Sequence, residues 1–179
     1  VILLLVVLTI SILFVDEQRK KFRRLSLTDS MTGLLNRNGF NLQLEKYLEG
    51  NKQKNCVGIL LDVDNFKFIN DVYGHTIGDQ VLLQLSQSLA QAFPDNSIIA
   101  RNGGDEFCII LKDCSAEEAA PMIDAFSKAS RSFSAKGVEH NYSISLGYAE
   151  YPANAEKVSD ILRYADIALY EVKLQGKHG

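Results

Sequence analysis

The sequence predicts a sandwich of the α/β or α+β class, with helices packed on a mixed or antiparallel sheet. Short apolar runs typical of buried strands alternate along the chain with longer stretches in which apolar residues recur at helical spacing. Two strands are separated only by the segment Asn102–Asp105, whose paired glycines are typical of a tight hairpin turn. Hydrophobic residues make up 46% of 179 residues, enough for the core of one domain.

The first fifteen residues are apolar except for Thr9 and Ser11. As a helix they would span about 22 Å, which is less than the hydrocarbon core of a bilayer, ~30 Å. Basic residues crowd the next segment: Arg19, Lys20, Lys21, Arg23 and Arg24. We expect residues 1–15 to be the C-terminal part of a transmembrane helix, followed by a cytoplasmic linker helix over residues 16–28. A buried core helix and a signal-peptide core are the alternatives.

Residues 29–179 are expected to form the folded domain, whose first half holds three helices and one strand. Apolar spacing and a following glycine predict a helix over Asn38–Glu49. The continuous apolar run Cys56–Leu61 predicts a buried strand. A short helix over Asn65–Tyr73 and a long helix over Gly78–Phe93 follow, the first closed by a glycine and the second by a proline.

The second half of the domain begins with the hairpin, whose strands are expected over Ile98–Arg101 and Glu106–Leu111. The segment Ser115–Glu118 has the composition of a capping box and opens the next helix. Large residues alternate with small ones from Tyr142 to Tyr148, which predicts one half-buried strand. A last helix is expected over Ser159–Leu174.

Composition and charge exclude several classes of protein. The net charge of −3 gives no basic footprint, so no nucleic-acid partner is expected. Cys56, Cys108 and Cys114 are odd in number and show no CxxC spacing, so we expect reduced thiols and no disulfide or zinc framework. Reduced thiols fit a domain that lies in the cytosol.

Acidic residues fall at two turns of the predicted fold. Asp62 and Asp64 end the first strand, and Asp105 and Glu106 lie at the tip of the hairpin. If these strands are neighbours, the carboxylates converge and repel one another unless a divalent cation neutralises them. Hard oxygen ligands favour Mg²⁺, which usually also binds substrate phosphates. For each acidic motif taken alone, ordinary turn chemistry is the alternative.

Four motifs occur in a fixed order along the chain: DSMTGLLNR from Asp29, DVDNFKFIND from Asp62, GHTIGD from Gly74 and GGDEF from Gly103. Together they closely resemble the GGDEF family of diguanylate cyclases, and the resemblance covers residues 28–177. It implies a ferredoxin-like, polymerase-palm-like sandwich with a mixed central sheet. It also implies a signalling enzyme that condenses two GTP molecules into cyclic di-GMP and two pyrophosphates.

The resemblance further implies a homodimer, because each subunit holds one GTP and two sites must face each other. Together with the apolar N-terminal segment, it places the protein at a bacterial inner membrane with the catalytic domain in the cytoplasm. Two other functions remain open. A catalytically weak domain would bind GTP or cyclic di-GMP as a regulatory module, and a domain with inert motifs would serve only for interaction.

By position in the motifs, the metal ions, Mg²⁺ or Mn²⁺, would be held by Asp62, Asp105, Glu106 and the backbone carbonyl of Val63. Asp105 and Glu106 would be the catalytic pair, with Asp105 as general base for the attacking 3′-hydroxyl. Direct activation of that hydroxyl by the metal is an equally physical account. The role of Asp64 stays undecided between the fold and the metal site.

The resemblance also implies the residues that bind GTP. The phosphates would be bound by the backbone N–H groups of Phe66 and Lys67, which open a helix, and by Lys173 and Lys177. Gly103 and Gly104 would also bind the substrate. Lys177 stands where the family often has arginine, so the two parallel hydrogen bonds that a guanidinium group donates to a phosphate are not available there. Asn70 and Asp79 match the guanine readers. As alternatives, Asn70 would be a helix cap near Gly74, and Asp79 would be the N-cap of the long helix.

Two further features depart from the family pattern. Many members carry an inhibitory product site, an RxxD motif that ends five residues before the first signature glycine. In this chain the corresponding positions are Pro94 and Ser97, so we expect no inhibitory site of this kind. Asn102 stands where the family commonly has a bulky residue, so the hairpin is expected to differ slightly there.

Overall fold

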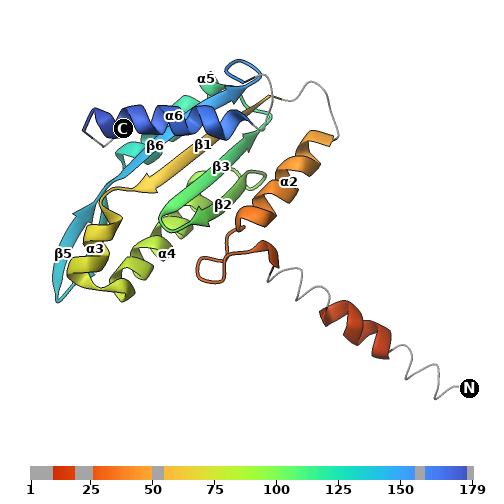
Figure 1. Ribbon diagram of the computed structural model, residues 1–179, viewed down its shortest axis with the longest axis horizontal. Coiled ribbons are helices and arrows are strands. Elements are labelled where there is room, and N and C mark those ends of the chain that lie inside the picture. Colours follow the sequence, from red (N-terminus) through yellow and green to blue (C-terminus); the bar gives the residue numbers. More distant parts are fainter. Residues whose placement is uncertain (1–9, 19–25, 50–54, 156–159, 177–179) are drawn as a thin grey trace, which may run out of the picture.

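The computed structural model of the protein describes residues 10–18, 26–49, 55–155 and 160–176. Its centre is a four-stranded sheet with the strand order β2-β3-β1-β6, in which every neighbouring pair is antiparallel (Figure 1). The strands are β1 (Cys56–Val63), β2 (Ile98–Gly103), β3 (Glu106–Lys112) and β6 (Ile144–Tyr151). Of the two sheet types left open by the sequence, the antiparallel one is therefore present.

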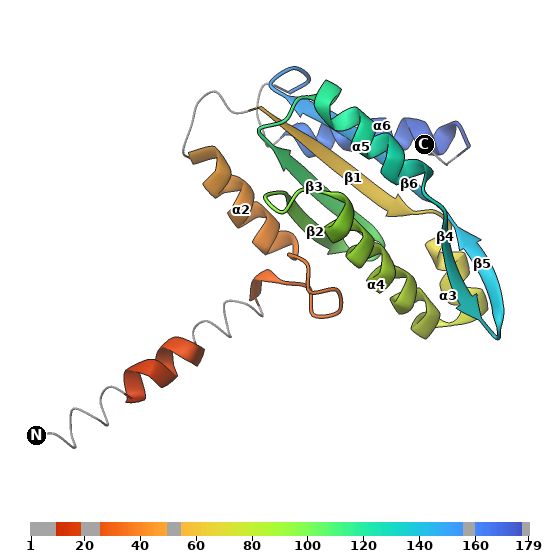
Figure 2. The ribbon, with the colours of Figure 1, turned by 180° about the vertical axis from the view of Figure 1, so that it is seen from behind.

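Helices cover both faces of this sheet. One face packs against α4 (His75–Ala92) and α5 (Ala116–Lys128), which lie in front in Figure 2. The other face packs against α2 (Arg37–Glu49) and α6 (Ile161–Leu174), which lie in front in Figure 1. Burial on both faces explains why β1 reads as a continuous apolar run rather than as an alternating one.

A short helix and a two-stranded sheet complete the domain at the end of β1. The helix α3 (Phe66–Tyr73) follows β1 and is joined directly to α4 through Gly74. The strands β4 (Arg131–Ala135) and β5 (Val138–Tyr142) form an antiparallel hairpin near α3 (Figure 1). The aromatic rings of Tyr73 and Phe133 meet edge to face, with centroids 5.2 Å apart.

Several local predictions are confirmed. The predicted first strand, short helix and hairpin strands lie within a few residues of β1, α3, β2 and β3. The capping box is present, because the Ser115 hydroxyl accepts from the backbone of Glu118 while the Glu118 carboxylate accepts from the backbone of Ser115. The three cysteines are free thiols, as expected.

Two predictions about element boundaries are wrong. The long helix begins at His75 and not at Gly78, because Gly74 rather than Asp79 provides its N-cap. The residues Tyr142–Tyr148 do not form one half-buried strand. Strand β5 ends at Tyr142 and β6 begins at Ile144, so Ser143 separates them. Strand β6 is covered on both faces, with Tyr148 as an exposed exception.

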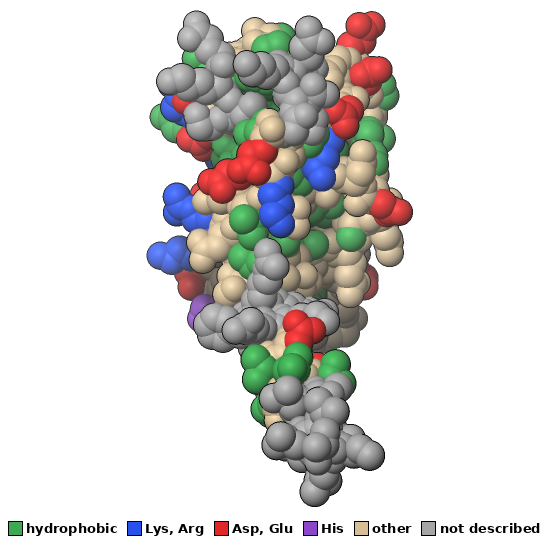
Figure 3. All heavy atoms as spheres, turned by 90° about the vertical axis from the view of Figure 1, so that its right-hand side faces the viewer, with side chains coloured by type: hydrophobic (Ala, Val, Ile, Leu, Met, Phe, Trp, Pro, Cys, Tyr) green, Lys and Arg blue, Asp and Glu red, His purple; other side chains and the backbone are tan. Residues whose placement is uncertain are grey.

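The N-terminal segment is described only in part. Residues 10–18 are helical, and the apolar side chains Ile10, Ile12, Leu13, Phe14 and Val15 are exposed (Figure 3). Across the described ranges, no helix has the length and apolar character needed to cross a bilayer. Residues 1–9 of the predicted membrane segment and the basic cluster at residues 19–24 lie outside the described residues, so membrane anchoring stays a prediction.

Candidate active site

The acids of the two turns converge, as the sequence predicts. Strands β1 and β3 are antiparallel neighbours, and their register places Asp62 directly opposite Glu106. Asp105 lies next to Glu106 at the start of β3. Burial raises the pKa of the Asp105 carboxyl, and the negative charge of Asp62 raises it further. The negative charges of Asp62 and Glu106 therefore both act on Asp105 at the end of β1.

A lysine from the last helix enters this group. The Lys173 Nζ atom lies 2.8 Å from the Asp62 Oδ2 atom, and the two side chains are 33% and 17% exposed. The positive charge of Lys173 also opposes the rise in the pKa of Asp105. The resemblance assigned Lys173 to phosphate and Asp62 to metal. The structure brings the two side chains together as an ion pair.

The residues present fit a hard divalent cation. Three carboxylates and the Val63 carbonyl position are oxygen donors of the kind that Mg²⁺ prefers. The pKa of Asp105 is raised mainly by burial and further by the negative charges of Asp62 and Glu106, and a cation would offset the effect of those charges. Within the described ranges, however, no three acidic, imidazole or thiol groups are gathered around one point. Lys173 supplies the positive charge at Asp62 instead.

The hairpin that carries the signature depends on its glycines. Gly103 has a φ of 139° and Gly104 a φ of 56°, a region in which other residues are strained. The register of β2 on β3 shifts between Arg101 and Gly103, so Asn102 lies in a bulge. Its Nδ2 atom donates to the Glu106 Oε2 atom at 3.2 Å. The departure at Asn102 thus gives Glu106 a neutral hydrogen-bond donor.

Arg101 connects the hairpin to the start of the domain. Its Nε and Nη2 atoms donate to the Gly104 carbonyl at 2.9 and 2.6 Å, and its Nη1 atom donates to both Asp29 carboxylate oxygens at 3.3 Å. Burial alone would raise the pKa of the Asp29 carboxyl, but hydrogen bonds from Thr32 and the charge of Arg101 lower it overall. We call these contacts the Arg101 clamp. The sequence gives no local signal for it, since Asp29 and Arg101 are far apart along the chain.

Asp64 serves the fold. Its side chain is 4% exposed and accepts hydrogen bonds from the hydroxyls of Ser143 and Ser145 at 2.6 and 2.7 Å. Its backbone N–H also donates to the Ser143 carbonyl at 3.0 Å. Asp64 thereby fastens the end of β1 to the junction between β5 and β6, which supports a role in the fold.

The first turn of α3 offers donors for an anion. The backbone N–H groups of Phe66 and Lys67 lie where helix geometry leaves N–H groups without an intrahelical acceptor. The N-cap residue Asn65 has a left-handed backbone with φ 54°, and its side chain makes no capping hydrogen bond. The positive end of the helix dipole also lies there, so this turn suits a phosphate.

The structure places the Asn70 side chain against Gly78, the residue before Asp79. The Asn70 side chain lies so close to Gly78 that a Cβ atom there would come within 2.0 Å of the Asn70 Oδ1 atom. Asp79 follows on the exposed surface of α4, in the second turn of that helix. The N-cap alternative for Asp79 is wrong, because Gly74 provides the N-cap of α4. At the end of α3, the Gly74 N–H donates to the backbone oxygen of Asn70.

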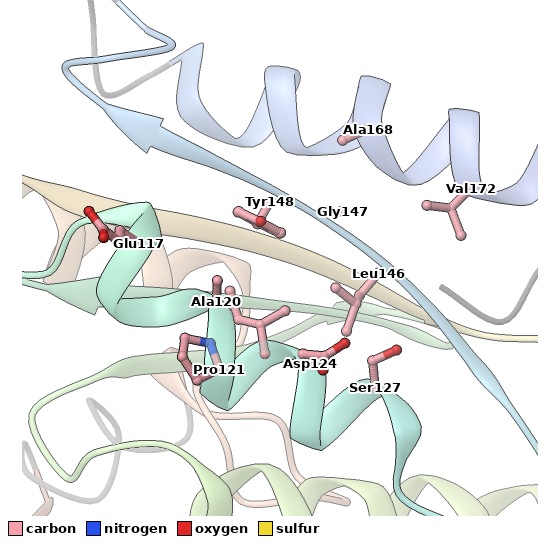
Figure 4. A pocket seen from close by; sticks show the side chains of 11 residues that line it. Glu117, Ala120, Pro121, Asp124, Ser127, Leu146, Gly147, Tyr148, Ala168 and Val172 are labelled. Carbon is pink, nitrogen blue, oxygen red and sulfur yellow. The ribbon is translucent and has the colours of Figure 1, made fainter.

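Two predicted positions need separate mention. Lys177 lies outside the described residues. At the turn that corresponds to the RxxD motif, where no inhibitory site is expected, the Ser97 N–H donates to the Pro94 carbonyl at 2.8 Å and no side chain is basic. A hollow of about 860 Å³ lies between α5, β6 and α6 (Figure 4). None of the described site residues lines it, so we do not assign the nucleotide to it.

Comparisons with known proteins show which family the chain is similar to. Residues 26–179 match the family model described as diguanylate cyclase, GGDEF domain. The chain is 32% identical over 161 residues to diguanylate cyclase A of Treponema denticola, covering 86% of this chain and 43% of that protein. It is 34% identical over 168 residues to the cyclic di-GMP phosphodiesterase PdeR of Escherichia coli, covering 91% of this chain and 25% of that protein. The chain thus spans less than half the length of these relatives.

A solved structure shows the same fold. The coiled coil and GGDEF domain of DgcB from Caulobacter crescentus, crystallised in complex with c-di-GMP, matches with a TM-score of 0.86 and 27% sequence identity. The match covers 97% of this chain and 94% of that chain.

Proposed function

The chain belongs to the GGDEF family, and from this premise we propose that it is a diguanylate cyclase that condenses two GTP molecules into cyclic di-GMP with release of two pyrophosphates. The observation that carries the proposal is the register of β1 on β3, which sets Asp62 opposite Glu106 with Asp105 beside them. The sequence retains Asp62, Asp105 and Glu106 of the family motif, and the charges of Asp62 and Glu106 act on Asp105.

Asp62, Asp105, Glu106 and the carbonyl of Val63 would hold Mg²⁺, or Mn²⁺ in its place. When bound, the cation neutralises the negative charge of the phosphates and of the oxygens that attack and leave. Lys173 complements it, because a cationic side chain already placed at Asp62 can also face a phosphate that approaches the acids.

The remaining residues orient the nucleotide. The N–H groups of Phe66 and Lys67 bind phosphate oxygens at the start of α3. Asp79, with Asn70 beside it, accepts from the N1–H and N2–H₂ donors of guanine, whereas adenine would present an acceptor at N1. The 3′-oxygen of one GTP forms a bond to the α-phosphorus of the other, and the bond to pyrophosphate breaks. Asp105 takes the proton of that 3′-hydroxyl, and a second such step closes the ring.

Assembly and location form part of the same proposal. One chain offers one GTP site, so the reaction requires a homodimer in which two sites face each other. We propose that residues 1–15 end a transmembrane helix of a bacterial inner membrane and that residues 16–28 form a linker helix, with the catalytic domain in the cytoplasm. The exposed apolar side chains of residues 10–18 and the likeness to a structure that includes a coiled coil support this arrangement.

The alternative is a catalytically weak domain that binds GTP or cyclic di-GMP only to regulate a partner. The observation in its favour is the relative named a cyclic di-GMP phosphodiesterase, of which this chain spans 25%. The complete set of motif acids favours the enzyme.

Substitution of the acids separates these two functions. Glu106→Gln and Asp62→Asn remove a charge that the cation site requires while keeping the side-chain size. We expect each to lower cyclic di-GMP synthesis more than a hundredfold with the domain still folded, whereas Glu118→Gln on the exposed start of α5 serves as the control. Synthesis near the wild-type rate by a folded Glu106→Gln variant would overturn the proposed metal site.

A further inference from the structure

One face of α3 exposes apolar side chains beside the first turn that is proposed to hold phosphate. Phe68 is 60% exposed and Val72 is 50% exposed, although both are large hydrophobic residues. Their spacing of four residues places them in one row along the helix. Lys67 and Asp71, also exposed and four residues apart, form a neighbouring row. We call these four residues the α3 face.

We propose that the α3 face is the contact through which a second copy of this chain brings its GTP site opposite the first. This inference rests on the proposed function, because only a reaction between two nucleotides leaves the site of one chain incomplete. It names the part of the surface on which the two copies meet, which the proposed function leaves open.

The charges of the α3 face favour its own copy as the partner. A two-fold axis that packs two α3 helices antiparallel sets each row against the same row of the other copy, with its direction reversed. Lys67 then lies against Asp71 of the partner subunit, and Phe68 lies against Val72 of the partner subunit. A parallel arrangement would set the charged row against the apolar row instead. Only the antiparallel arrangement is therefore complementary in both charge and polarity.

The same arrangement brings the two phosphate sites near each other. The N-terminus of α3 lies about 5 Å along the helix from the midpoint of the face, because each residue advances the helix by about 1.5 Å. With helix axes about 9 Å apart, the two helix N-termini lie roughly 13 Å from each other. Nucleotides bound at the two N-termini would therefore face the same space between the two subunits.

The surface beside Phe68 is hollowed. A cavity of about 410 Å³ lies between α3 and the β4–β5 hairpin, and Phe68 lines it together with the aromatic side chains of Tyr73, Phe133, His140 and Tyr142. An apolar side chain of the partner that packs against Phe68 would meet this aromatic wall as well. The α3 face thus combines a protruding part with a recess, as a self-complementary contact requires.

The contact is small, which determines how it acts. A helix of eight residues is about 12 Å long and about 10 Å wide. Its footprint is far below the roughly 800 Å² per partner of a stable interface. The α3 face therefore associates weakly by itself, and a linker that keeps two copies together raises their effective concentration.

Cysteine cross-linking tests the contact independently of catalysis. A full chain carrying Phe68→Cys is mixed with a full chain carrying Val72→Cys, both with Cys114→Ser to remove the half-exposed native thiol, and a short bismaleimide is added. We expect cross-linked dimers of the mixed pair that increase when GTP is present without Mg²⁺. A control pair that replaces Val72→Cys by Ile167→Cys, at a position 48% exposed on α6, should give few. Equal yields from the two pairs would overturn the inference.

Turnover by single variants gives the second test. Phe68→Glu places two like charges in the apolar row, and we expect it to lower cyclic di-GMP synthesis at least tenfold at low protein concentration. Its capacity for one GTP analogue per chain should stay unchanged, and Ile167→Glu should behave as wild type. Phe68→Glu with the wild-type rate would overturn the inference and leave the proposed function standing. If the mixed cysteine pair cross-links but the wild-type chain forms no product, the proposed function alone would be overturned.

Discussion

The Arg101 clamp offers a quantitative test of how the domain positions its signature. The change is Arg101→Lys, compared with Arg101→Ala. Lysine keeps the positive charge but lacks the planar guanidinium group, so it cannot donate to the Gly104 carbonyl and to the Asp29 carboxylate at the same time. Alanine removes both contacts and leaves the Asp29 carboxylate, whose side chain is 23% exposed, without its cation.

The expected magnitude follows from these contacts. A hydrogen bond from a charged donor contributes about 1.5–3 kcal/mol to stability. Two of the donors share one carbonyl, and the bonds to Asp29 are long at 3.3 Å, so the contributions do not add fully. We expect Arg101→Ala to lower the free energy of unfolding by about 2–4 kcal/mol and Arg101→Lys by about 1–2 kcal/mol.

Urea unfolding measures these differences, and Arg163→Ala is the matched control. Arg163 forms an ion pair with Asp160 at 3.8 Å with side chains 60% and 37% exposed, so its loss should change the free energy of unfolding by less than about 1 kcal/mol. Turnover of GTP should fall in Arg101→Lys even where the protein is still folded, because the Gly104 carbonyl loses its donors. If Arg101→Ala unfolds like Arg163→Ala, the clamp does not hold the hairpin.

Three further predictions concern the base, the pH and the product. Asp79→Asn replaces a pure acceptor by a group with its own donors, so kcat/KM for GTP should fall sharply; an unchanged value would remove Asp79 from guanine recognition. The lowered pKa of Asp29 contributes stability that is complete above its ordinary value of 3.8 and is lost as the pH falls through the folded value. The free energy of unfolding, measured with urea, should therefore fall less at acid pH in Asp29→Asn than in the wild type. An identical fall in both proteins would count against this prediction. Cyclic di-GMP at low micromolar concentration should not inhibit non-competitively, because Pro94 and Ser97 offer no charged partner; such inhibition, lost on substitution of that turn, would reveal a site of another form.

Signals that lie close together in the sequence predicted much of the fold. The continuous run of β1, the paired glycines of the signature hairpin and the capping box at Ser115 each depend on a few adjacent residues. The hairpin of β4 and β5 also has a glycine at its turn, where Lys136 and Gly137 both adopt positive φ. The sequence pattern does not predict this hairpin, because its strands bury few apolar side chains.

Contacts between distant segments could not be predicted in this way. The approach of Asn70 in α3 to the first turns of α4 depends on Gly78, whose missing side chain leaves room for it. The Arg101 clamp joins β2 to a turn 72 residues earlier. The family motifs assigned Asp62 and Lys173 to different partners, and only the packing of α6 on the sheet shows that they form an ion pair.

The account is tested most directly by the product of the reaction. The full chain is incubated with GTP and Mg²⁺, and the nucleotides are identified by mass and quantified together with released pyrophosphate. We predict cyclic di-GMP with two pyrophosphates for each molecule formed, and none without a divalent cation. A folded protein that binds GTP but forms no cyclic di-GMP at any concentration would contradict the account and favour the regulatory module.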